Sequence, residues 1–499
     1  MFNGIDFNKL LQIFTFDKYN PLLFSTSLFL FLFFALLIFY RIFIHNRNAR
    51  VALLLIFSFF FYYEISGVFF LILLVSSTMN YFFGILIGTS SIYSKRKFWF
   101  IAAVTANLLL LGYFKYTNFF IEIINNFKVG HLTAVDIFLP IGISFYTFKA
   151  LSYIIDVFWD NLEYEKNFLY FSLFISFFAN LLAGPIDRAT EFLPQIKKEV
   201  KISKAQIGLA LYLIISGLFK KVVIADYISL NFVDRVFQSP LRFTGLENLL
   251  GIYGYTLQIY ADFSGYSDMA IGIALLLGFR LMDNFNSPYQ AKSISEFWRR
   301  WHISLSTWLL DYLFKPLQMK FRNWRIYGNA LALLITFSLI GLWHGASWMF
   351  ILWGTVHGLY MVVSLFTKKY RRKFYNRLGI GNSKFLKVFQ VFITFHLVAF
   401  AWLLFRANSL TDVGDMLSQI FTFFHGEVLM QFISGYKSVF FIMIIGYILH
   451  FIPKSIEIKT QNLLAKIPLI GQALLLTAVI WLVIQVKSAA IQPFIYFKF

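Results

Sequence analysis

The chain of 499 residues contains no cysteine and little charge. The lack of cysteine excludes disulfide bonds, thiolate catalysis and zinc–thiolate sites. Charged residues make up only 14% of the chain, whereas hydrophobic residues make up 59% and aromatic residues 21%. This composition excludes a soluble globular protein and a disordered one. No internal repeat and no Gly/Ser-rich linker divides the sequence, so we predict a single integral domain over residues 1–499.

Long apolar stretches separated by short basic loops predict an all-α, polytopic integral membrane protein. We expect about eleven to thirteen transmembrane helices, with re-entrant or interfacial helices among them. The alternating short segments of an outer-membrane barrel are absent. The formal charge is +20, and basic clusters such as residues 95–97 and 368–373 lie in short loops. We attribute this excess to the positive-inside bias and to membrane lipids, not to nucleic acid. The topology of residues 115–205 stays open, because simple alternation conflicts with the charge rule there.

Two histidines stand out in the stretch from residue 295 to 348. His302 lies in residues 297–304 (FWRRWHIS), where aromatic residues recur at spacings of three and four. This period predicts an amphipathic helix at the membrane interface, with Arg299, His302 and Ser306 on one polar face. His344 follows a long apolar run and stands between glycines, which indicates either a close backbone approach or a helix break that lines a cavity. The alternative is a histidine packed between helices and bonded to a carbonyl group.

Further polar residues interrupt the apolar spans at residues 262–268 (DFSGYSD). They favour either a functional element or an interfacial loop whose Ser and Asp side chains cap the next helix. Residues 139–144 predict a Pro-kinked helix entry, and residues 182–188 predict a turn that ends a span. The other histidines receive structural interpretations: core or helix-interface positions for His357, His396 and His450, and loops for His45, His131 and His425.

Five motifs occur together in one order: residues 139–145 (LPIGISF), 183–186 (AGPI), 262–268 (DFSGYSD), 297–304 (FWRRWHIS) and 342–345 (LWHG). This set resembles the membrane-bound O-acyltransferase (MBOAT) family, in its bacterial branch that acetylates alginate or peptidoglycan. The resemblance extends over roughly residues 25–499. It implies helices around a central tunnel, with His344 as the catalytic histidine and His302 near it as a second catalytic residue. The candidate residues for binding the substrate or donor in that tunnel are Trp298, Arg299, Ser306, Asp262, Tyr266, Asp268 and Trp343.

The resemblance also implies the chemistry. Acetyl groups are drawn from a cytoplasmic thioester, expected to be acetyl-CoA, and delivered outside the cell. A histidine shielded from water stays neutral and can act as a general base. A thioester is already activated, so we expect no bound cofactor and no metal, and no His-Glu-x-x-His spacing is present. His302, with Arg299 and Ser306 on its face, either orients the acceptor or binds the anionic part of the donor. The alternative for Arg299 is contact with lipid phosphates only.

The chain ends with residues 493–499 (PFIYFKF) directly after an apolar run. Composition alone favours an aromatic anchor in the headgroup layer. The ending, however, resembles the C-terminal signature of this transfer pathway, which implies that Tyr496 carries the acyl group transiently and is a third catalytic residue. The final transfer would then belong to an extracytoplasmic partner of the SGNH-hydrolase type, because this chain has no Gly-x-Ser-x-Gly element.

These features predict a multi-pass O-acetyltransferase of the bacterial inner membrane. The expected acceptor is peptidoglycan, with alginate or another exopolysaccharide as the alternative. D-alanylation of teichoic acids is less favoured, because the chain resembles the acetylating branch more closely. A different class, a transporter or channel, is suggested by broken apolar helices with embedded polar groups, although no internal duplication supports it.

Overall fold

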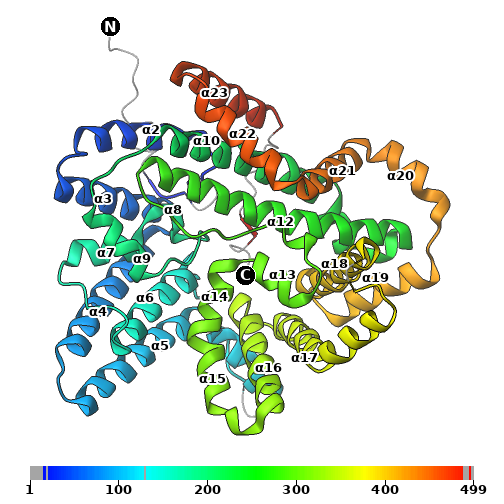
Figure 1. The fold of residues 1–499 in the computed structure, drawn as a ribbon, viewed down its shortest axis with the longest axis horizontal. Helices are drawn as coiled ribbons and strands as arrows, with labels where there is room; N and C mark the ends of the chain where they lie inside the picture. The colour runs from blue at the N-terminus through cyan, green and yellow to red at the C-terminus, as the bar shows by residue number, and fades with distance from the viewer. Residues whose placement is uncertain (1–14, 18–20, 128–130, 382, 487–493, 496–499) are drawn as a thin grey trace. The chain divides into compact units, whose positions relative to one another are not determined.

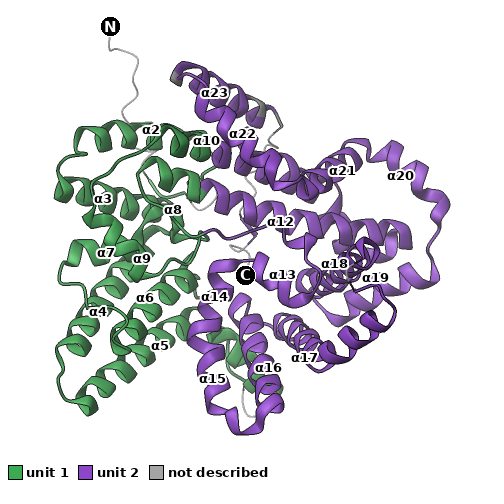
Figure 2. Cartoon of the chain, in the orientation of Figure 1, with its two compact units in different colours: residues 1–210, 270–282 green, residues 211–269, 283–499 purple. Residues whose placement is uncertain are grey.

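The computed structural model describes residues 15–17, 21–127, 131–381, 383–486 and 494–495 (Figure 1). Within these ranges the chain forms helices joined by loops and contains no β-strand, which confirms the all-α prediction. Contacts divide the chain into two compact units, residues 1–210 with 270–282 and residues 211–269 with 283–499 (Figure 2). The expected organisation of residues 1–499 as one domain stays a prediction.

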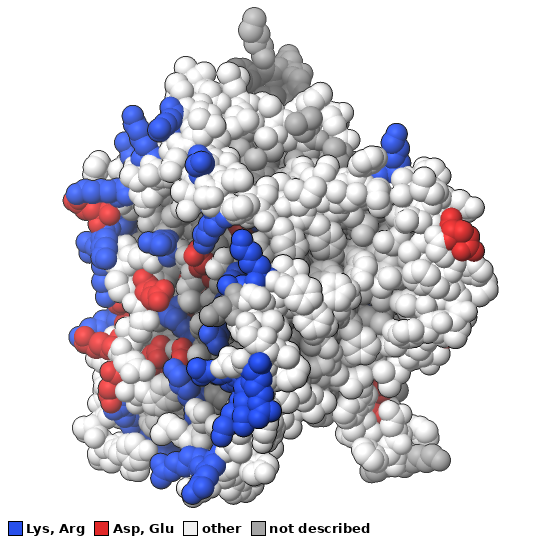
Figure 3. Space-filling model, turned by 45° about the vertical axis from the view of Figure 1, so that its right-hand side comes forward, with Lys and Arg blue, Asp and Glu red and all other residues white. Residues whose placement is uncertain are grey.

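Six helical segments of the described chain are long and apolar enough to cross a membrane, or seven if one bent pair counts as a span. They are Arg47–Thr89, Tyr93–Asn126, Lys204–Gln238, Arg322–His344, Trp348–Arg377 and Lys384–Arg406, and the bent pair is Gly426–Gly435 with Lys437–Phe451. The protein is therefore a multi-pass membrane protein. In the view of Figure 3 most of the surface belongs to residues other than Lys, Arg, Asp and Glu. Most of the Lys and Arg side chains in this view lie on its left side, with several Asp and Glu side chains among them.

The number of long spans is smaller than the eleven to thirteen expected, because several apolar helices are short. α2 (Ser27–Ile42) and α6 (Ile143–Phe158) have 16 residues each. At a rise of 1.5 Å per residue such a helix is about 24 Å long, less than the thickness of about 30 Å of the hydrocarbon core.

The first unit is built from α2, α3 (Arg47–Ser66), η1 (Gly67–Phe69), α4 (Phe70–Thr89), α5 (Tyr93–Asn126), α6, α7 (Phe168–Ser176), α8 (Phe178–Leu181) and α9 (Ala189–Lys197). Its core contains a cluster of phenylalanine rings, in which Phe29, Phe61 and Phe178 contact one another at centroid distances of 5.7, 5.9 and 6.4 Å. α3 ends at Gly67, whose positive φ of 57° suits glycine best.

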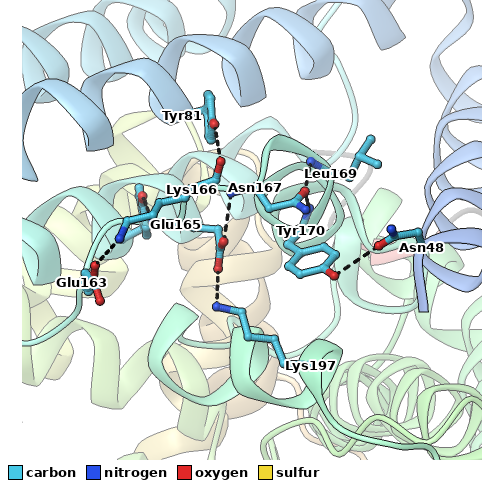
Figure 4. Close-up of polar contacts among 10 residues, drawn as sticks. Asn48, Tyr81, Glu163, Glu165, Lys166, Asn167, Leu169, Tyr170 and Lys197 are labelled. Atoms are coloured by element: carbon cyan, nitrogen blue, oxygen red, sulfur yellow. Dashed lines mark hydrogen bonds and ion pairs between the residues drawn. The ribbon is translucent and has the colours of Figure 1, made fainter. Parts of the chain in front are cut away.

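The loop between α6 and α7 is fixed by polar contacts (Figure 4). Asn167 caps α7 by accepting the backbone N–H groups of Leu169 and Tyr170 at 2.9 and 3.3 Å. Glu165 accepts the N–H of Asn167 at 3.0 Å and forms an ion pair of 2.9 Å with Lys197 on α9. These contacts fix the charged loop at the edge of the core, where Glu165 is itself buried.

The second unit holds the two histidine motifs. α10 (Lys204–Leu218) and α12 (Gly245–Leu276) contribute residues to both units. The other elements of the second unit are η2 (Phe219–Asp226), η3 (Ser229–Val233), α11 (Asp234–Gln238), η4 (Pro240–Arg242), η5 (Pro288–Gln290), α13 (Ile294–Arg300), α14 (Ile303–Leu309), η6 (Leu310–Phe314), α15 (Lys315–Lys320), η7 (Arg322–Trp324), α16 (Arg325–His344), α17 (Trp348–Arg377), α18 (Lys384–Arg406), α19 (Leu410–Thr422), η8 (Gly426–Val428), α20 (Leu429–Gly435), α21 (Lys437–Phe451), α22 (Lys454–Lys466) and α23 (Leu469–Val486). α16 and α17 form a tight antiparallel pair, since a Cβ atom on Gly341 would collide with the carbonyl oxygen of Phe350.

Candidate active site

His302 lies at a break between two short helices. α13 ends just before it, and α14 begins just after it. Its backbone has a φ of 44°, in the left-handed region that is unfavourable for residues other than glycine. The prediction of one continuous amphipathic helix is therefore wrong. Trp301 and His302 leave the helical path, and both side chains are buried in the interior.

The break separates His302 from the polar residues that were expected to share its face. His302 is fully buried, whereas Arg299 is exposed and donates to the Ser295 hydroxyl at 3.3 Å. The Ser306 hydroxyl donates to the carbonyl oxygen of Trp301 at 3.2 Å. The predicted common face of Arg299, His302 and Ser306 is wrong, because helical periodicity does not continue through a left-handed residue.

Asn284 fixes the orientation of the His302 ring. Its side-chain oxygen lies 3.0 Å from Nδ1 of His302 and accepts the N–H and hydroxyl of Ser304 at 3.3 and 2.9 Å. Its amide nitrogen donates to the hydroxyl of Ser267 at 3.0 Å. A backbone N–H can only donate, so the atom facing it must be the amide oxygen. Nδ1 of His302 therefore carries the proton.

This arrangement prepares the other ring nitrogen of His302 for chemistry. Burial lowers the pKa of His302 to about 3, so the ring is neutral at ordinary pH. With the proton on Nδ1, Nε2 is the basic nitrogen. No sequence signal identifies Asn284, because it lies in a polar loop where nothing distinguishes one asparagine from another.

His344 is the last residue of α16, and its side chain is buried. Its ring contacts Trp343, Trp353 and Phe405 at centroid distances of 4.9, 5.0 and 5.5 Å. The next residue must be glycine, because a Cβ atom on Gly345 would collide with the ring of Phe350. The sequence correctly placed a helix end at His344, and the need for glycine there is steric.

Trp343 links the two histidines within one aromatic cluster. Its ring lies 6.3 Å from that of His302 and 4.9 Å from that of His344. The ring of Trp298 lies 6.0 Å from that of Trp353 and so belongs to the same cluster. The structure thus brings together four of the expected site residues. The tunnel that should reach them stays a prediction.

His357 belongs to this cluster as well, although the sequence indicated only a core position. It accepts a hydrogen bond from Nε1 of Trp298 at 3.3 Å, and its ring lies 5.1 Å from that of Trp353. The core interpretation describes its burial correctly. Its helical spacing of four from Trp353 was the available signal that it faces the same side as the site.

Asp262, Tyr266 and Asp268 lie in the middle of α12, a continuous helix of 32 residues. The alternatives of an interfacial loop and a helix cap at this stretch are therefore wrong. Two carboxylates remain in the helix interior because neighbouring lysines neutralise them. Lys221 pairs with Asp262 at 2.5 Å, and Lys220 pairs with Asp268 at 2.7 Å.

The C-terminal motif reaches this part of α12. Phe494 and Ile495 are both buried. The ring of Phe494 lies 5.0 Å from that of Tyr266 and 5.5 Å from that of Phe263, and Phe263 in turn lies 4.6 Å from His302. Tyr496, the expected acyl acceptor, lies outside the described residues.

Arg299 lines a basic cavity of about 500 Å³ between α13, α17 and α18. Its cationic side chains are those of Lys292, Arg299, Lys368, Arg371 and Arg372. No carboxylate is among the residues that line it, and Ser295, Ser364 and Tyr375 add hydroxyl groups. The cavity therefore suits an anionic ligand that carries several phosphate groups.

Among the residues that the structure describes, no group of three His, Cys, Asp or Glu side chains is placed to hold a metal ion. The expectation of chemistry without a metal stays a prediction.

The fold and the site define a polytopic helical membrane protein with a buried pair of histidines in an aromatic cluster. The chain belongs to the membrane-bound O-acyltransferase family, whose model matches residues 160–401. It is 39% identical over 355 residues to the protein named "Probable alginate O-acetylase AlgI" of Pseudomonas aeruginosa, covering 70% of this chain and 65% of that protein.

Two further relatives have other substrates in their names. The chain is 35% identical over 369 residues to the peptidoglycan O-acetyltransferase of Helicobacter pylori, covering 68% of each chain. It is 32% identical over 283 residues to the teichoic acid D-alanyltransferase of Bacillus subtilis, covering 54% of this chain and 69% of that protein. The family and the resemblance noted from the motifs are therefore confirmed.

Proposed function

We propose that the protein is an O-acetyltransferase of the bacterial inner membrane, which moves acetyl groups from cytoplasmic acetyl-CoA towards a cell-envelope polysaccharide. The observation that carries this proposal is the continuity of the site. The C-terminal motif contacts Phe263, Phe263 contacts His302, and Trp343 connects His302 with His344. Phe494 and Ile495 directly precede Tyr496 in the sequence, so their contacts support Tyr496 as the acceptor at this centre.

In the proposed reaction His344 acts as the general base. It takes the phenolic proton of Tyr496, and the phenolate oxygen attacks the carbonyl carbon of the acetyl thioester. The C–S bond breaks, and the departing thiolate receives the proton back from the His344 imidazolium. The products are acetyl-Tyr496 and free coenzyme A thiol, so no other reactant is required.

His302 has the role of orienting the acceptor. Its neutral ring offers Nε2 as a hydrogen-bond acceptor for a hydroxyl group, because Asn284 holds the proton on Nδ1. An aromatic surrounding of low polarity strengthens such a bond. The two histidines therefore have different functions: proton transfer for His344 and positioning for His302.

The basic cavity beside Arg299 supports a phosphate-bearing donor. Coenzyme A carries a diphosphate and a ribose phosphate, and five cationic side chains line the cavity. Anionic lipid headgroups share this chemistry. Arg371→Ala and Arg372→Ala together should raise the KM for acetyl-CoA about tenfold at unchanged kcat. If the cavity binds anionic lipid headgroups instead, the increase in KM should disappear when anionic lipid is added to the assay.

The acceptor polysaccharide is proposed to be peptidoglycan, with alginate or another exopolysaccharide as the alternative. The relatives support both, since their names include peptidoglycan and alginate acetylation. An extracytoplasmic SGNH-type partner would take the acetyl group from Tyr496 and pass it to the sugar hydroxyl. Isolated peptidoglycan and alginate, each offered together with an SGNH-type acetyltransferase, would distinguish the two acceptors.

The decisive experiment incubates the purified protein with radiolabelled acetyl-CoA and measures label bound to the chain. Labelling should be lost in His344→Ala and in Tyr496→Phe. His425→Ala is the matched control, because that histidine lies in an exposed loop. Labelling that persists unchanged in both variants would disprove the mechanism. If the chain is labelled only by D-alanyl thioesters, the donor is D-alanyl and not acetyl. If His344→Ala still transports an unmodified solute, the protein is a transporter.

A further inference from the structure

α12 carries two similar ion pairs, one at Asp262 and one at Asp268. Asp262 and Asp268 pair with Lys221 and Lys220, two successive residues of the neighbouring element η2. η2 has the π-helical form, which is rare and often occurs at functional sites. The two pairs differ in what else they contact.

Asp262 has a second partner, which is the C-terminal segment. Its Oδ1 pairs with Lys221, and its Oδ2 accepts the backbone N–H of Ile495 at 2.8 Å. Lys221 also pairs with Asp226 at 2.7 Å, so one buried ammonium group is shared by two carboxylates. Beside the shared ammonium group of Lys221, a second donor stabilises the carboxylate of Asp262. The Ile495 N–H supplies that donor.

Apolar contacts hold the same segment on the same face of α12. Phe494 is 1% exposed and Ile495 is 7% exposed. The Phe494 ring stacks on Tyr266 at 5.0 Å, and Tyr266 lies one helical turn from Asp262. The backbone bond and the stacked ring act on neighbouring residues, which fixes both the position and the direction of the chain.

We propose that Asp262, held by Lys221, is a positioning residue that binds the backbone of the C-terminal segment and so presents Tyr496 to the histidine centre. The binding site consists of Asp262, Phe263 and Tyr266, and its ligand is the chain's own Phe494–Ile495. This inference rests on the proposed function in one respect, the role of Tyr496 as acceptor. The binding of the segment itself does not depend on that role.

Position 498 offers a direct test, because the chain has no cysteine and Lys498→Cys gives a single thiol for a nitroxide spin label. In the full-length protein the label should be immobilised. Asp262→Leu with Lys221→Met removes the acceptor and both charges of the buried pair, so the only carboxylate among the described residues that loses a lysine contact is that of the partly exposed Asp226. This variant should release the label. Asp262→Asn keeps an acceptor oxygen and should give an intermediate mobility.

The matched control is Asp268→Leu with Lys220→Met, which deletes the other ion pair of α12 and should leave the label immobilised. Acetyl loading of Tyr496 should fall about 100-fold in the Asp262 variant at saturating acetyl-CoA, with an unchanged KM for acetyl-CoA, because lost positioning lowers kcat. A label that stays immobile in the Asp262 variant, or one that both double variants release equally, would overturn the proposal. If wild-type protein shows no acetyl loading, the proposed function fails, while the spin-label measurement still tests the binding site.

Discussion

Each unit of the molecule contains a buried polar centre, and the two centres differ in how their polar atoms are used. In the first unit Lys149 donates to the side-chain oxygen of Asn180 at 2.9 Å and to the carbonyl oxygen of Ile175 at 3.3 Å. Asn180 donates to Asp187 at 2.7 Å, and Asp187 also accepts the N–H of Met282 at 2.9 Å. Every contact joins two segments of the chain, so this centre stabilises the fold.

The centre of the second unit has a different organisation. The bonds of Asn284 fix His302 through Nδ1 and assign the basic nitrogen to Nε2. The ring of His344 is buried against the rings of Trp343, Trp353 and Phe405. Both centres connect separate segments of the chain, since Asn284 bonds Ser267, His302 and Ser304. They differ in that the bonds of Asn284 also determine which nitrogen of a histidine ring carries the proton.

The largest expected effect is on the second centre. His344→Ala should reduce acetyl loading at least about 1,000-fold, because general base catalysis contributes a factor of about 10² to 10⁴ and the thioester alone does not deprotonate a phenol. The measurement is initial loading rate per folded molecule. His357→Ala, which alters the same aromatic cluster, should reduce loading much less. Equal losses in the two variants would contradict the distinction between a base and a packing histidine.

The first centre should respond in stability. Lys149→Met leaves the buried Asp187 and Asn180 without their cationic partner, which should lower the free energy of unfolding by about 3 kcal/mol. Thermal unfolding in detergent measures this loss. Acetyl loading per folded molecule should stay within about twofold of the wild type. A large loss of kcat in protein that is still folded would show that the first centre has a chemical role too.

A smaller effect is expected for the residue that orients His302. Asn284→Ala removes the acceptor for Nδ1 and allows the other tautomer, so kcat should fall about 10- to 100-fold with a nearly unchanged KM for acetyl-CoA. Asn284→Asp keeps an acceptor for Nδ1 and should retain more activity than Asn284→Ala. The opposite order of the two variants would exclude tautomer control.

The sequence predicted the fold class from local signals, and it indicated the motif residues through their resemblance to a known family. Apolar runs between basic loops identify membrane helices, and a Gly-flanked histidine after such a run identifies the end of α16. The break at His302 was missed because its cause is not local. Asn284, 18 residues earlier, stabilises a left-handed conformation that the helical period of the aromatic residues contradicts.

The polar stretch of α12 was misjudged for the same reason. Two carboxylates in an apolar sequence indicate a loop, unless partners from another helix neutralise them. Lys220 and Lys221 are those partners, and they lie more than 40 residues away in the chain. Pairings over such distances carry no periodic signal. The contact of Ile495 with Asp262 spans 233 residues and was equally beyond prediction.

The smallest expected effect concerns pH. Burial lowers the pKa of His302 from about 6.5 to about 3, so between these values the unfolded chain binds a proton that the folded chain does not. Stability should therefore rise with pH across this window and decline as the pH falls from about 6.5. Replacing His302 with Gln should make stability depend less steeply on pH. His425→Ala, at an exposed position, should leave this pH dependence unchanged. The check is the unfolding temperature in detergent at pH values between 4.5 and 7.5. If the unfolding temperatures of the wild type and His302→Gln change with pH in the same way, the His302 ring is accessible to protons in the folded protein. The comparison between the two buried centres would then fail at His302.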